Sequence, residues 1–406
     1  MQGTVMRKGA AALVTIILLA ASSMVAASPV VSSSIVEVEN NWTDVAPLPT
    51  PHYFVLGAAV ADEKIYFFGH GISERYDPPT NIWSAIAPMP VYNSWATVTA
   101  CQNKIYVIGG LADKPTQVYD PATNTWANRT SIPQSFCRQK ASVVGDKIYV
   151  MGGAIFVQGI IMTSSTNYVY DLATDSWSTM APIPMPVEGY ASAVLDDKIY
   201  IIGGGTTTGF PIDASKTVQI FDPESNQWSN GTSIPTGVSC AGACTTSGLF
   251  APERIYVVGG TTRVSGGWLS IDPEAESKTD LTQVYDPATG EWSLAAPMLD
   301  KRWFVSLVNV DDLLYAVGGQ NGSDDGIYVT ERSNMTEVMQ RFASTKVQAT
   351  VKYIPIGYDE TPAASPTPTA DTVPAVPFLA VSVFAIVIMV VGLLVYFKKR
   401  KRQALS

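Results

Sequence analysis

The stretch KIYVIGG at residues 104–110 is followed by VYDPATNTW at 118–126, and this pair of motifs decides the fold because it recurs along the chain. Four other copies carry both motifs: KIYFFGH (64–70) with RYDPPTNIW (75–83), KIYVMGG (147–153) with VYDLATDSW (169–177), KIYIIGG (198–204) with IFDPESNQW (220–228), and RIYVVGG (254–260) with VYDPATGEW (284–292). A sixth copy begins with LLYAVGG (313–319) and continues to VKYIPIGY (351–358) without a tryptophan. A period of about 40 to 60 residues indicates a propeller or a solenoid.

Each motif is expected to form a strand followed by a turn. The β-branched and aromatic residues of KIYVIGG suit a buried strand, which the paired glycines end. In VYDPATNTW, Asp-Pro favours a turn, so Trp126 is expected to begin the returning strand. An apolar stretch such as SWATVTA (94–100) precedes each KIY segment and supplies one more strand. The sequence therefore predicts four strands per repeat.

The recurring di-glycine, tyrosine and tryptophan resemble the kelch motif over residues 42–358. The resemblance implies an all-β, six-bladed β-propeller with one four-stranded blade per repeat. Departures from the motif are local: His70 replaces the second glycine of blade 1, Leu172 replaces the turn proline of blade 3, and Leu313 and Leu314 open blade 6.

The missing tryptophan of the sixth copy is expected at the start of the domain. The segment NWTDVAPLP (41–49) matches IWSAIAPMP (82–90), which is the fourth-strand segment of blade 1. Trp42 is therefore predicted to belong to blade 6, whose other three strands come from the end of the domain. This arrangement closes the ring and leaves no blade incomplete at the seam.

The segments outside the ring predict a single-pass membrane protein. Residues 1–27 combine Arg7 and Lys8 with an apolar run and small residues near Ala27, as secretory signal peptides do. Residues 376–397 are apolar and uncharged, and the basic KKRKR (398–402) follows them, which indicates a transmembrane helix with a cytoplasmic tail. The expected organisation is a signal peptide (1–27), a lead-in (28–40), the propeller (41–360), a Pro/Thr/Ser-rich stalk (361–375), the helix (376–397) and the tail (398–406).

The charge distribution agrees with this topology. All 35 acidic residues lie between the two apolar segments, so the expected outer portion has 19 basic residues and a net charge of −16. An acidic surface argues against nucleic acid as a partner. A plasma-membrane protein with an extracellular propeller is expected. Five sequons, which are expected in turns or loops, are N-glycosylation acceptors in such a chain: Asn41, Asn128, Asn230, Asn321 and Asn334.

The four cysteines do not suggest a disulfide framework. Cys137 and Cys240 are expected at the starts of inner strands of blades 3 and 5, and Cys101 at the far end of the inner strand of blade 2. On an extended strand Cys240 and Cys244 would be roughly 13 Å apart, which exceeds the reach of a disulfide. Buried, structural thiols are therefore favoured, with a bridge between these two only if the strand bulges.

A ligand site is expected on the face that carries the loops between second and third strands. These loops vary from GIS (71–73) in blade 1 to the 13-residue AIFVQGIIMTSST in blade 3, with longer loops in blades 5 and 6. Long loops on a rigid scaffold often carry binding residues. Candidates near the inner-strand starts on this face are His52, Tyr53, Trp95, Arg138, Glu188, Arg302 and Trp303, with the two tryptophans as the expected contacts.

Two enzymatic alternatives remain open. Kelch-type propellers include galactose oxidase, whose copper site needs two histidines, but the only two here, His52 and His70, have no evident further ligands. A sialate mutarotase of the kelch type would need an acid/base pair at the mouth, for which Glu188 and Arg138 are candidates. No catalytic residue, metal ligand or cofactor is assigned.

The sequence therefore predicts a membrane-anchored cell-surface propeller that binds a glycan or a protein. The alternatives are a carbohydrate-active enzyme and a structural envelope component without a discrete ligand. Fold alone does not choose among them, because propellers host unrelated functions.

Overall fold

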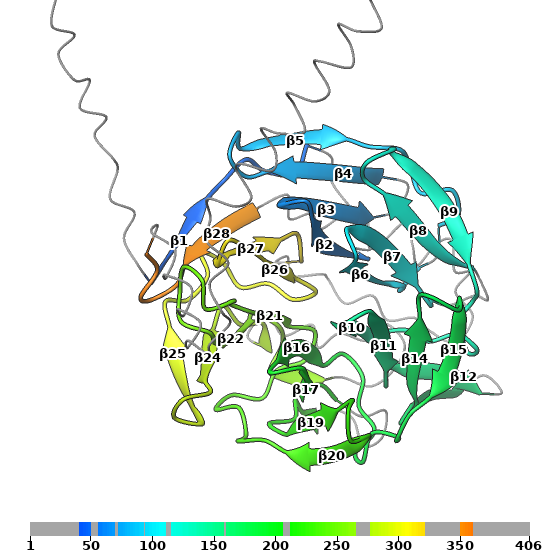
Figure 1. The fold of residues 1–406 in the computed structure, drawn as a ribbon. Coiled ribbons are helices and arrows are strands. Elements are labelled where there is room, and N and C mark those ends of the chain that lie inside the picture. The colour runs from blue at the N-terminus through cyan, green and yellow to red at the C-terminus, as the bar shows by residue number, and fades with distance from the viewer. Residues whose placement is uncertain are drawn as a thin grey trace, which may run out of the picture. The chain divides into compact units, whose positions relative to one another are not determined.

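The computed structural model describes residues 40–49, 56–69, 72–92, 94–110, 115–157, 160–205, 212–264, 277–320 and 350–359. These residues form six four-stranded antiparallel sheets around a central axis (Figure 1), which confirms the predicted all-β, six-bladed propeller. No helix among them is long and apolar enough to span a membrane. The predicted signal peptide (1–27), stalk (361–375) and membrane helix (376–397) lie outside the described residues.

The first three blades run outward from the axis in chain order. Blade 1 comprises β2 (Gly57–Ala61), β3 (Lys64–Gly69), β4 (Ile72–Asp77) and β5 (Ile82–Ala85). Blade 2 comprises β6 (Thr97–Cys101), β7 (Lys104–Ile108), β8 (Thr116–Asp120) and β9 (Thr125–Arg129). Blade 3 comprises β10 (Lys140–Val144), β11 (Lys147–Met151), β14 (Asn167–Asp171) and β15 (Ser176–Thr179).

The remaining blades follow the same plan, except that blade 6 takes its outer strand from the start of the domain. Blade 4 comprises β16 (Ala191–Leu195), β17 (Lys198–Ile202), β19 (Val218–Asp222) and β20 (Gln227–Asn230). Blade 5 comprises β21 (Gly242–Thr245), β22 (Ile255–Val258), β24 (Thr282–Asp286) and β25 (Glu291–Ala295). Blade 6 comprises β26 (Ser306–Val310), β27 (Leu313–Val317), β28 (Thr350–Ile354) and β1 (Asn41–Asp44).

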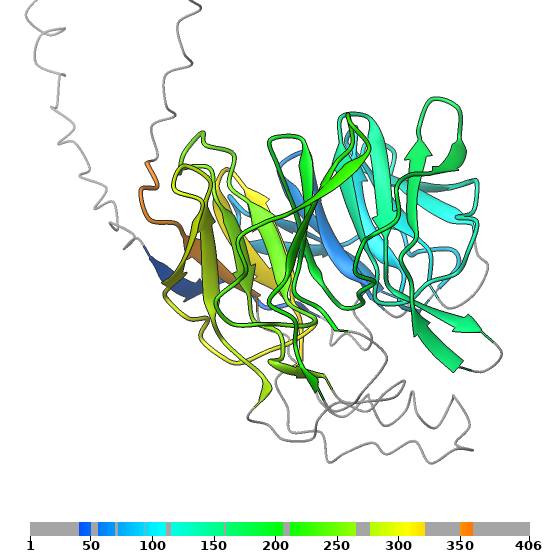
Figure 2. The same cartoon turned by 90° about the horizontal axis from the view of Figure 1, so that it is seen from below.

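Two short sheets extend the loop face, which is the face that carries the connections between second and third strands. In blade 3, β12 (Ala154–Val157) and β13 (Ile160–Thr163) form a hairpin where the sequence predicted a loop. The loops of blades 4 and 5 pair through β18 (Ile212–Asp213) and β23 (Arg263–Val264). Figure 2 shows the β12–β13 hairpin extending on the lower side of the ring.

An aromatic pair repeats in every blade and joins it to the preceding blade. A tyrosine or phenylalanine of the third strand lies 4.9–5.3 Å, centroid to centroid, from the tryptophan of the fourth strand. The indole Nε1 then donates to a backbone carbonyl of the preceding blade at 2.8–3.1 Å. The six tryptophans are Trp42, Trp83, Trp126, Trp177, Trp228 and Trp292. Large aromatic side chains therefore fill the wedges between neighbouring blades.

The two ends of the domain close the ring as predicted. β1 pairs with β28 in the register Trp42↔Tyr353. The buried Trp42 side chain donates through Nε1 to Thr282 Oγ1 and to the carbonyl of Ala296, both at 3.1 Å and both in blade 5. Asn40 Oδ1 accepts from the backbone N–H of Ala296 at 2.7 Å and from the Tyr353 hydroxyl at 2.8 Å. A four-residue strand thus ties blade 6 to blade 5.

The glycine pairs end the second strands because the backbone there turns through a conformation that other residues rarely adopt. In blade 4, Gly203 and Gly204 have φ of +68° and +85°. A Cβ on Gly203 would lie 2.3 Å from the carbonyl oxygen of Val238, in the next blade. The Gly204 N–H donates to that same oxygen at 2.8 Å. Glycine therefore allows the close approach of neighbouring blades.

On the turn face, opposite the loop face, a buried carboxylate organises the loop 247–251 of blade 5. Asp312 is fully buried and accepts backbone N–H groups of Ser247, Leu249, Phe250 and Ala251. Burial alone would raise the pKa of Asp312, but these hydrogen bonds outweigh it and hold the pKa below its ordinary value.

The loop 247–251 also receives the end of the described chain. Phe250 stacks on Tyr358 at 6.1 Å between centroids, and its carbonyl accepts from the Asp359 N–H at 2.6 Å. The chain therefore leaves the ring on the turn face, on the upper side in Figure 2.

Replacing Trp42 with alanine is expected to lower the free energy of unfolding by about 3–5 kcal/mol, because a buried indole and its two hydrogen bonds to blade 5 are lost. Chemical denaturation of the full chain measures the change. Deletion of the predicted stalk 361–374 is the control and should leave the ring unchanged. Equal midpoints for the two variants would contradict the closure role of β1.

Replacing Asp312 with asparagine is expected to cost about 2–4 kcal/mol at pH 7, because an amide cannot accept all of these backbone donors. The folded-state pKa of Asp312 is lowered, so its contribution is present above the unfolded pKa of about 4 and is lost as the pH falls further. The difference between wild type and Asp312→Asn should therefore shrink in denaturation curves below about pH 4. A constant difference down to pH 2 would contradict this assignment.

Candidate functional site

A rim of left-handed residues surrounds the axis on the loop face. Two residues before the inner strands of blades 2 to 6, φ is positive at five equivalent positions, which are Trp95 (+66°), Arg138 (+57°), Gly189 (+61°), Cys240 (+56°) and Phe304 (+53°). We call these five residues the rim. The five positions share a positive φ but carry five different residue types. The fold therefore determines the backbone conformation at the rim, and the side chain differs from blade to blade.

Backbone hydrogen bonds link successive rim residues across the blades. The N–H of Gly189 donates to the carbonyl of Arg138 at 3.0 Å, Cys240 to Gly189 at 2.5 Å, and Phe304 to Cys240 at 2.8 Å. The rim is therefore held by main-chain contacts, so its side chains can be used for other purposes.

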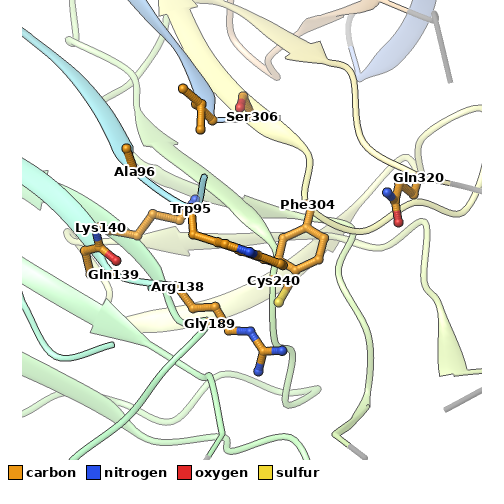
Figure 3. A pocket seen from close by; sticks show the side chains of 11 residues that line it. Trp95, Ala96, Arg138, Gln139, Lys140, Gly189, Cys240, Phe304, Ser306 and Gln320 are labelled. Carbon is orange, nitrogen blue, oxygen red and sulfur yellow. The ribbon is translucent and has the colours of Figure 1, made fainter. Parts of the chain in front are cut away.

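The side chains of the rim cover the axis. Trp95 packs edge-on against Phe304 of blade 6 with centroids 5.5 Å apart, and the Arg138 guanidinium lies 5.6 Å from the Trp95 ring centroid (Figure 3). The geometry suits a cation–π interaction, which contributes roughly 0.5–2 kcal/mol. Three blades thus supply one connected aromatic and cationic surface.

Arg138 is also paired with a carboxylate. Its Nη1 lies 2.9 Å from Oε1 of Glu188, whose side chain is buried. Burial opposes the charge of Arg138, but the fields of Glu188, Cys240 and Cys137 outweigh it and raise the pKa of Arg138. The pair keeps the guanidinium charged and oriented under the indole.

Two connected cavities lie at the rim. The mouth, a cavity of about 70 Å³, is lined by Trp95, Arg138, Lys140, Cys240, Phe304 and others. The channel, a cavity of about 270 Å³, lies along the inner strands, and Leu56, Lys140 and Ser306 line both. A ligand group entering the mouth therefore meets aromatic faces first and the Lys140 side chain behind them.

Several polar groups at the mouth have no hydrogen-bond partner in the described part of the chain. They include the buried Oε1 atoms of Gln139 and Gln320, whose residues line the mouth. Buried polar atoms in folded proteins are usually satisfied by protein or by bound molecules. The mouth thus offers hydrogen-bonding capacity that the ring itself does not use.

The structure brings together three of the predicted site residues. Trp95 and Arg138 belong to the rim, and Glu188 is held against Arg138. Arg302 and Trp303 do not line the mouth, because both are buried. Arg302 bonds instead to Asp300 Oδ2 at 3.0 Å and to the Gly318 carbonyl at 3.3 Å. His52 and Tyr53 lie outside the described residues.

Sequence reasoning missed Phe304, Lys140 and Cys240. A usable signal was present, because the rim residues of blades 2, 3, 4 and 6 stand nine residues before the first residue of the second strand of their blade, as Trp95 does before Lys104. This spacing selects Phe304 and not Trp303. In blade 5 the spacing is longer because the turn-face loop is inserted.

The other sequence expectations concern cysteines, sequons and metals. All four thiols are free, and Cys101 and Cys137 are buried as expected, whereas Cys240 and Cys244 are only partly buried. Burial raises the pKa of Cys240. The expectation that the sequons lie in turns or loops was wrong for Asn41, Asn128 and Asn230. These residues are exposed on the outer strands β1, β9 and β20, because each stands one or two positions from the tryptophan of that strand. Asn321 and Asn334 lie outside the described residues.

No group of three or more histidine, cysteine or acidic side chains that could hold a metal occurs within the described ranges. His70, like His52, falls outside them, so the copper alternative stays untested.

Comparison with known proteins agrees with the ring geometry. The family model described as KLHDC2/KLHL20/DRC7 Kelch-repeats domain matches residues 95–319, which is more than half of the chain. The chain belongs to the kelch-repeat family. This result confirms the predicted resemblance.

Individual relatives of this kelch protein match it over part of their length. Kelch-like protein 35 from Mus musculus is 35% identical over 154 residues, which are 38% of this chain and 26% of that protein. Kelch-like protein 23 from Homo sapiens is 26% identical over 262 residues, which are 63% of this chain and 43% of that protein. The chain therefore spans less than half the length of these curated relatives.

A solved structure shows the same architecture. The structure titled "Structure of YjhT" superposes with a TM-score of 0.55 at 18% identity and covers 68% of this chain and 93% of that one. At this identity the likeness concerns the fold alone.

Proposed function

We propose that this kelch propeller is a membrane-anchored binding module that presents its mouth to a protein ligand outside the cell. The observation that carries the proposal is the conformation of Trp95, Arg138 and Phe304, three bulky residues with positive φ. A residue with a Cβ in this region is strained by roughly 1–2 kcal/mol. Blade 4 uses glycine at the same position, so the fold does not require a large side chain there.

The surface around the mouth favours a protein ligand over a glycan. The mouth cavity of about 70 Å³ suits a single inserted side chain better than a sugar chain. The β12–β13 hairpin extends the loop face with an apolar sequence, and its Met162 side chain is 49% exposed. Trp, Arg and Phe are typical of the anchoring residues of protein interfaces.

The enzymatic alternative has weaker support. Glu188, the candidate acid or base, is buried and already bonded to Arg138, so it would have to leave its partner to reach a substrate. Its position fits an orienting role for the guanidinium.

The membrane anchor is supported by the sequence and by the place where the described chain ends. The apolar segment 376–397 with its basic flank is typical of a spanning helix. Asp359, the last described residue, lies on the turn face, opposite the mouth. The exposed sequons Asn41, Asn128 and Asn230 lie on outer strands, where glycans would leave the mouth uncovered.

Replacing Trp95 with glycine is expected to weaken ligand binding at least tenfold, or about 1.4 kcal/mol, because the central aromatic contact is lost. Stability should change by less than about 1 kcal/mol, since glycine relieves the positive φ. The probes are a displayed library of random peptides and a glycan array, and selected binders are then titrated against the full-chain variants.

The matched control is Trp83→Ala, which should lose about 3–5 kcal/mol of stability and keep its affinity. Peptides that bind Trp95→Gly as tightly as wild type would contradict the proposed site. Selection of glycans alone would replace the protein ligand by a carbohydrate.

The proposed topology is tested by adding protease to intact cells. Digestion is expected to remove the propeller and to leave an epitope on the tail 398–406 protected, because the basic flank stays on the cytoplasmic side. Cleavage of the tail epitope from outside would reverse the orientation.

A further inference from the structure

Lys140 has no ion-pair partner among the described residues. It begins β10, is partly buried, and lines both the mouth and the channel. No carboxylate of the described chain lies within ion-pair distance of its ammonium group, and no hydrogen bond from Nζ is formed within that part of the chain. Burial lowers the pKa of Lys140, and the nearby Cys240 opposes this only in part. A charge that is partly removed from water destabilises the folded state to that extent unless something neutralises it.

The channel behind Lys140 is built from small and neutral groups. Its lining includes Thr99, Ser192, Cys244 and Ser306, and none of its lining residues is acidic. The hydroxyls of Thr99 and Ser306 make no hydrogen bond to described groups, so they remain available as donors. A cavity of about 270 Å³ with one cation and free hydroxyl donors has the chemistry of an anion site.

We propose that the channel beneath the rim binds a small anion, a carboxylate or an inorganic oxyanion, whose charge is neutralised by Lys140. The Trp95–Phe304 pair lines the adjoining mouth, which shares Leu56, Lys140 and Ser306 with the channel. Lysine is a point charge with three donors, so it accepts carboxylate and tetrahedral oxyanions alike. Arg138 does not compete for the anion, because Glu188 already neutralises it.

The test uses the full chain and three probes, which are sodium acetate, sodium sulfate and sodium phosphate, at constant ionic strength in a bulky sulfonate buffer. Calorimetric titration of the wild type is expected to show saturable one-to-one binding of at least one probe. Acetate binding indicates a carboxylate ligand, and sulfate or phosphate binding indicates an inorganic oxyanion. The absence of saturable binding for all three probes would overturn the proposal.

The variant Lys140→Met removes the charge and keeps the length of the side chain. It is expected to weaken anion binding more than tenfold, whereas Lys140→Arg restores it. Lys147→Met, at an exposed position at the far end of the same strand pair, is the matched control and should bind as wild type does. Equal affinity of Lys140→Met and wild type would overturn the assignment.

Melting temperature supplies a second readout that does not depend on calorimetry. Without anion, Lys140→Met should melt roughly 2 °C or more above wild type, because it lacks the desolvated charge. Saturating anion should close this gap by stabilising only the wild type. A gap that is unchanged by anion would count against the site. The experiment needs no protein ligand, so its result is independent of the binding test at Trp95.

Discussion

In blades 2 to 5, the second glycine of the pair donates a hydrogen bond to a carbonyl of the next blade, and this is the contact on which the ring depends. Gly110 donates to Phe136, Gly153 to Val187, Gly204 to Val238 and Gly260 to Arg302, at 2.8–3.0 Å. Each bond joins the end of a second strand to the segment that precedes the next inner strand. Both partners are backbone groups, so the receiving segment is fixed in place whatever side chains it carries.

This separation of backbone and side chain explains how one scaffold can carry a specific site. The glycine contact and the N–H bonds between successive rim residues set the positive φ. The fold therefore determines where a rim side chain begins but not what it is. Trp95, Arg138 and Phe304 meet because three blades happen to place large groups at positions that Gly189 and Cys240 fill with small ones. The rim side chains can therefore differ between blades while the backbone contacts between the blades stay the same.

Sequence reasoning succeeded where the signal repeats and is local. The tryptophan that bonds to the preceding blade recurs six times, so the position of Trp42 could be predicted and the closure of the ring followed from it. The rim was harder to identify, because its members share a backbone angle and no residue type. Candidates chosen for an aromatic or charged side chain near the inner-strand start included Arg302 and Trp303, both of which are buried. Phe304, the next residue along the chain, is the rim residue and was not chosen. The β12–β13 hairpin was missed because its segment lies outside the repeat.

The two cations near the axis show how packing and function can be distinguished. Arg138 has a buried carboxylate at 2.9 Å, which is how a protein normally stabilises a charge inside. Lys140, two residues later, has no such partner among the described residues, although an apolar side chain would fill the same position without desolvation. The expected outer portion of the chain has a net charge of −16, which repels anions at long range. Screening limits that repulsion to about 8–10 Å at physiological salt, whereas the charge of Lys140 acts at contact distance in a less polar cavity. The local attraction of Lys140 for an anion therefore outweighs the long-range repulsion, so an acidic protein can still bind an anion in its channel.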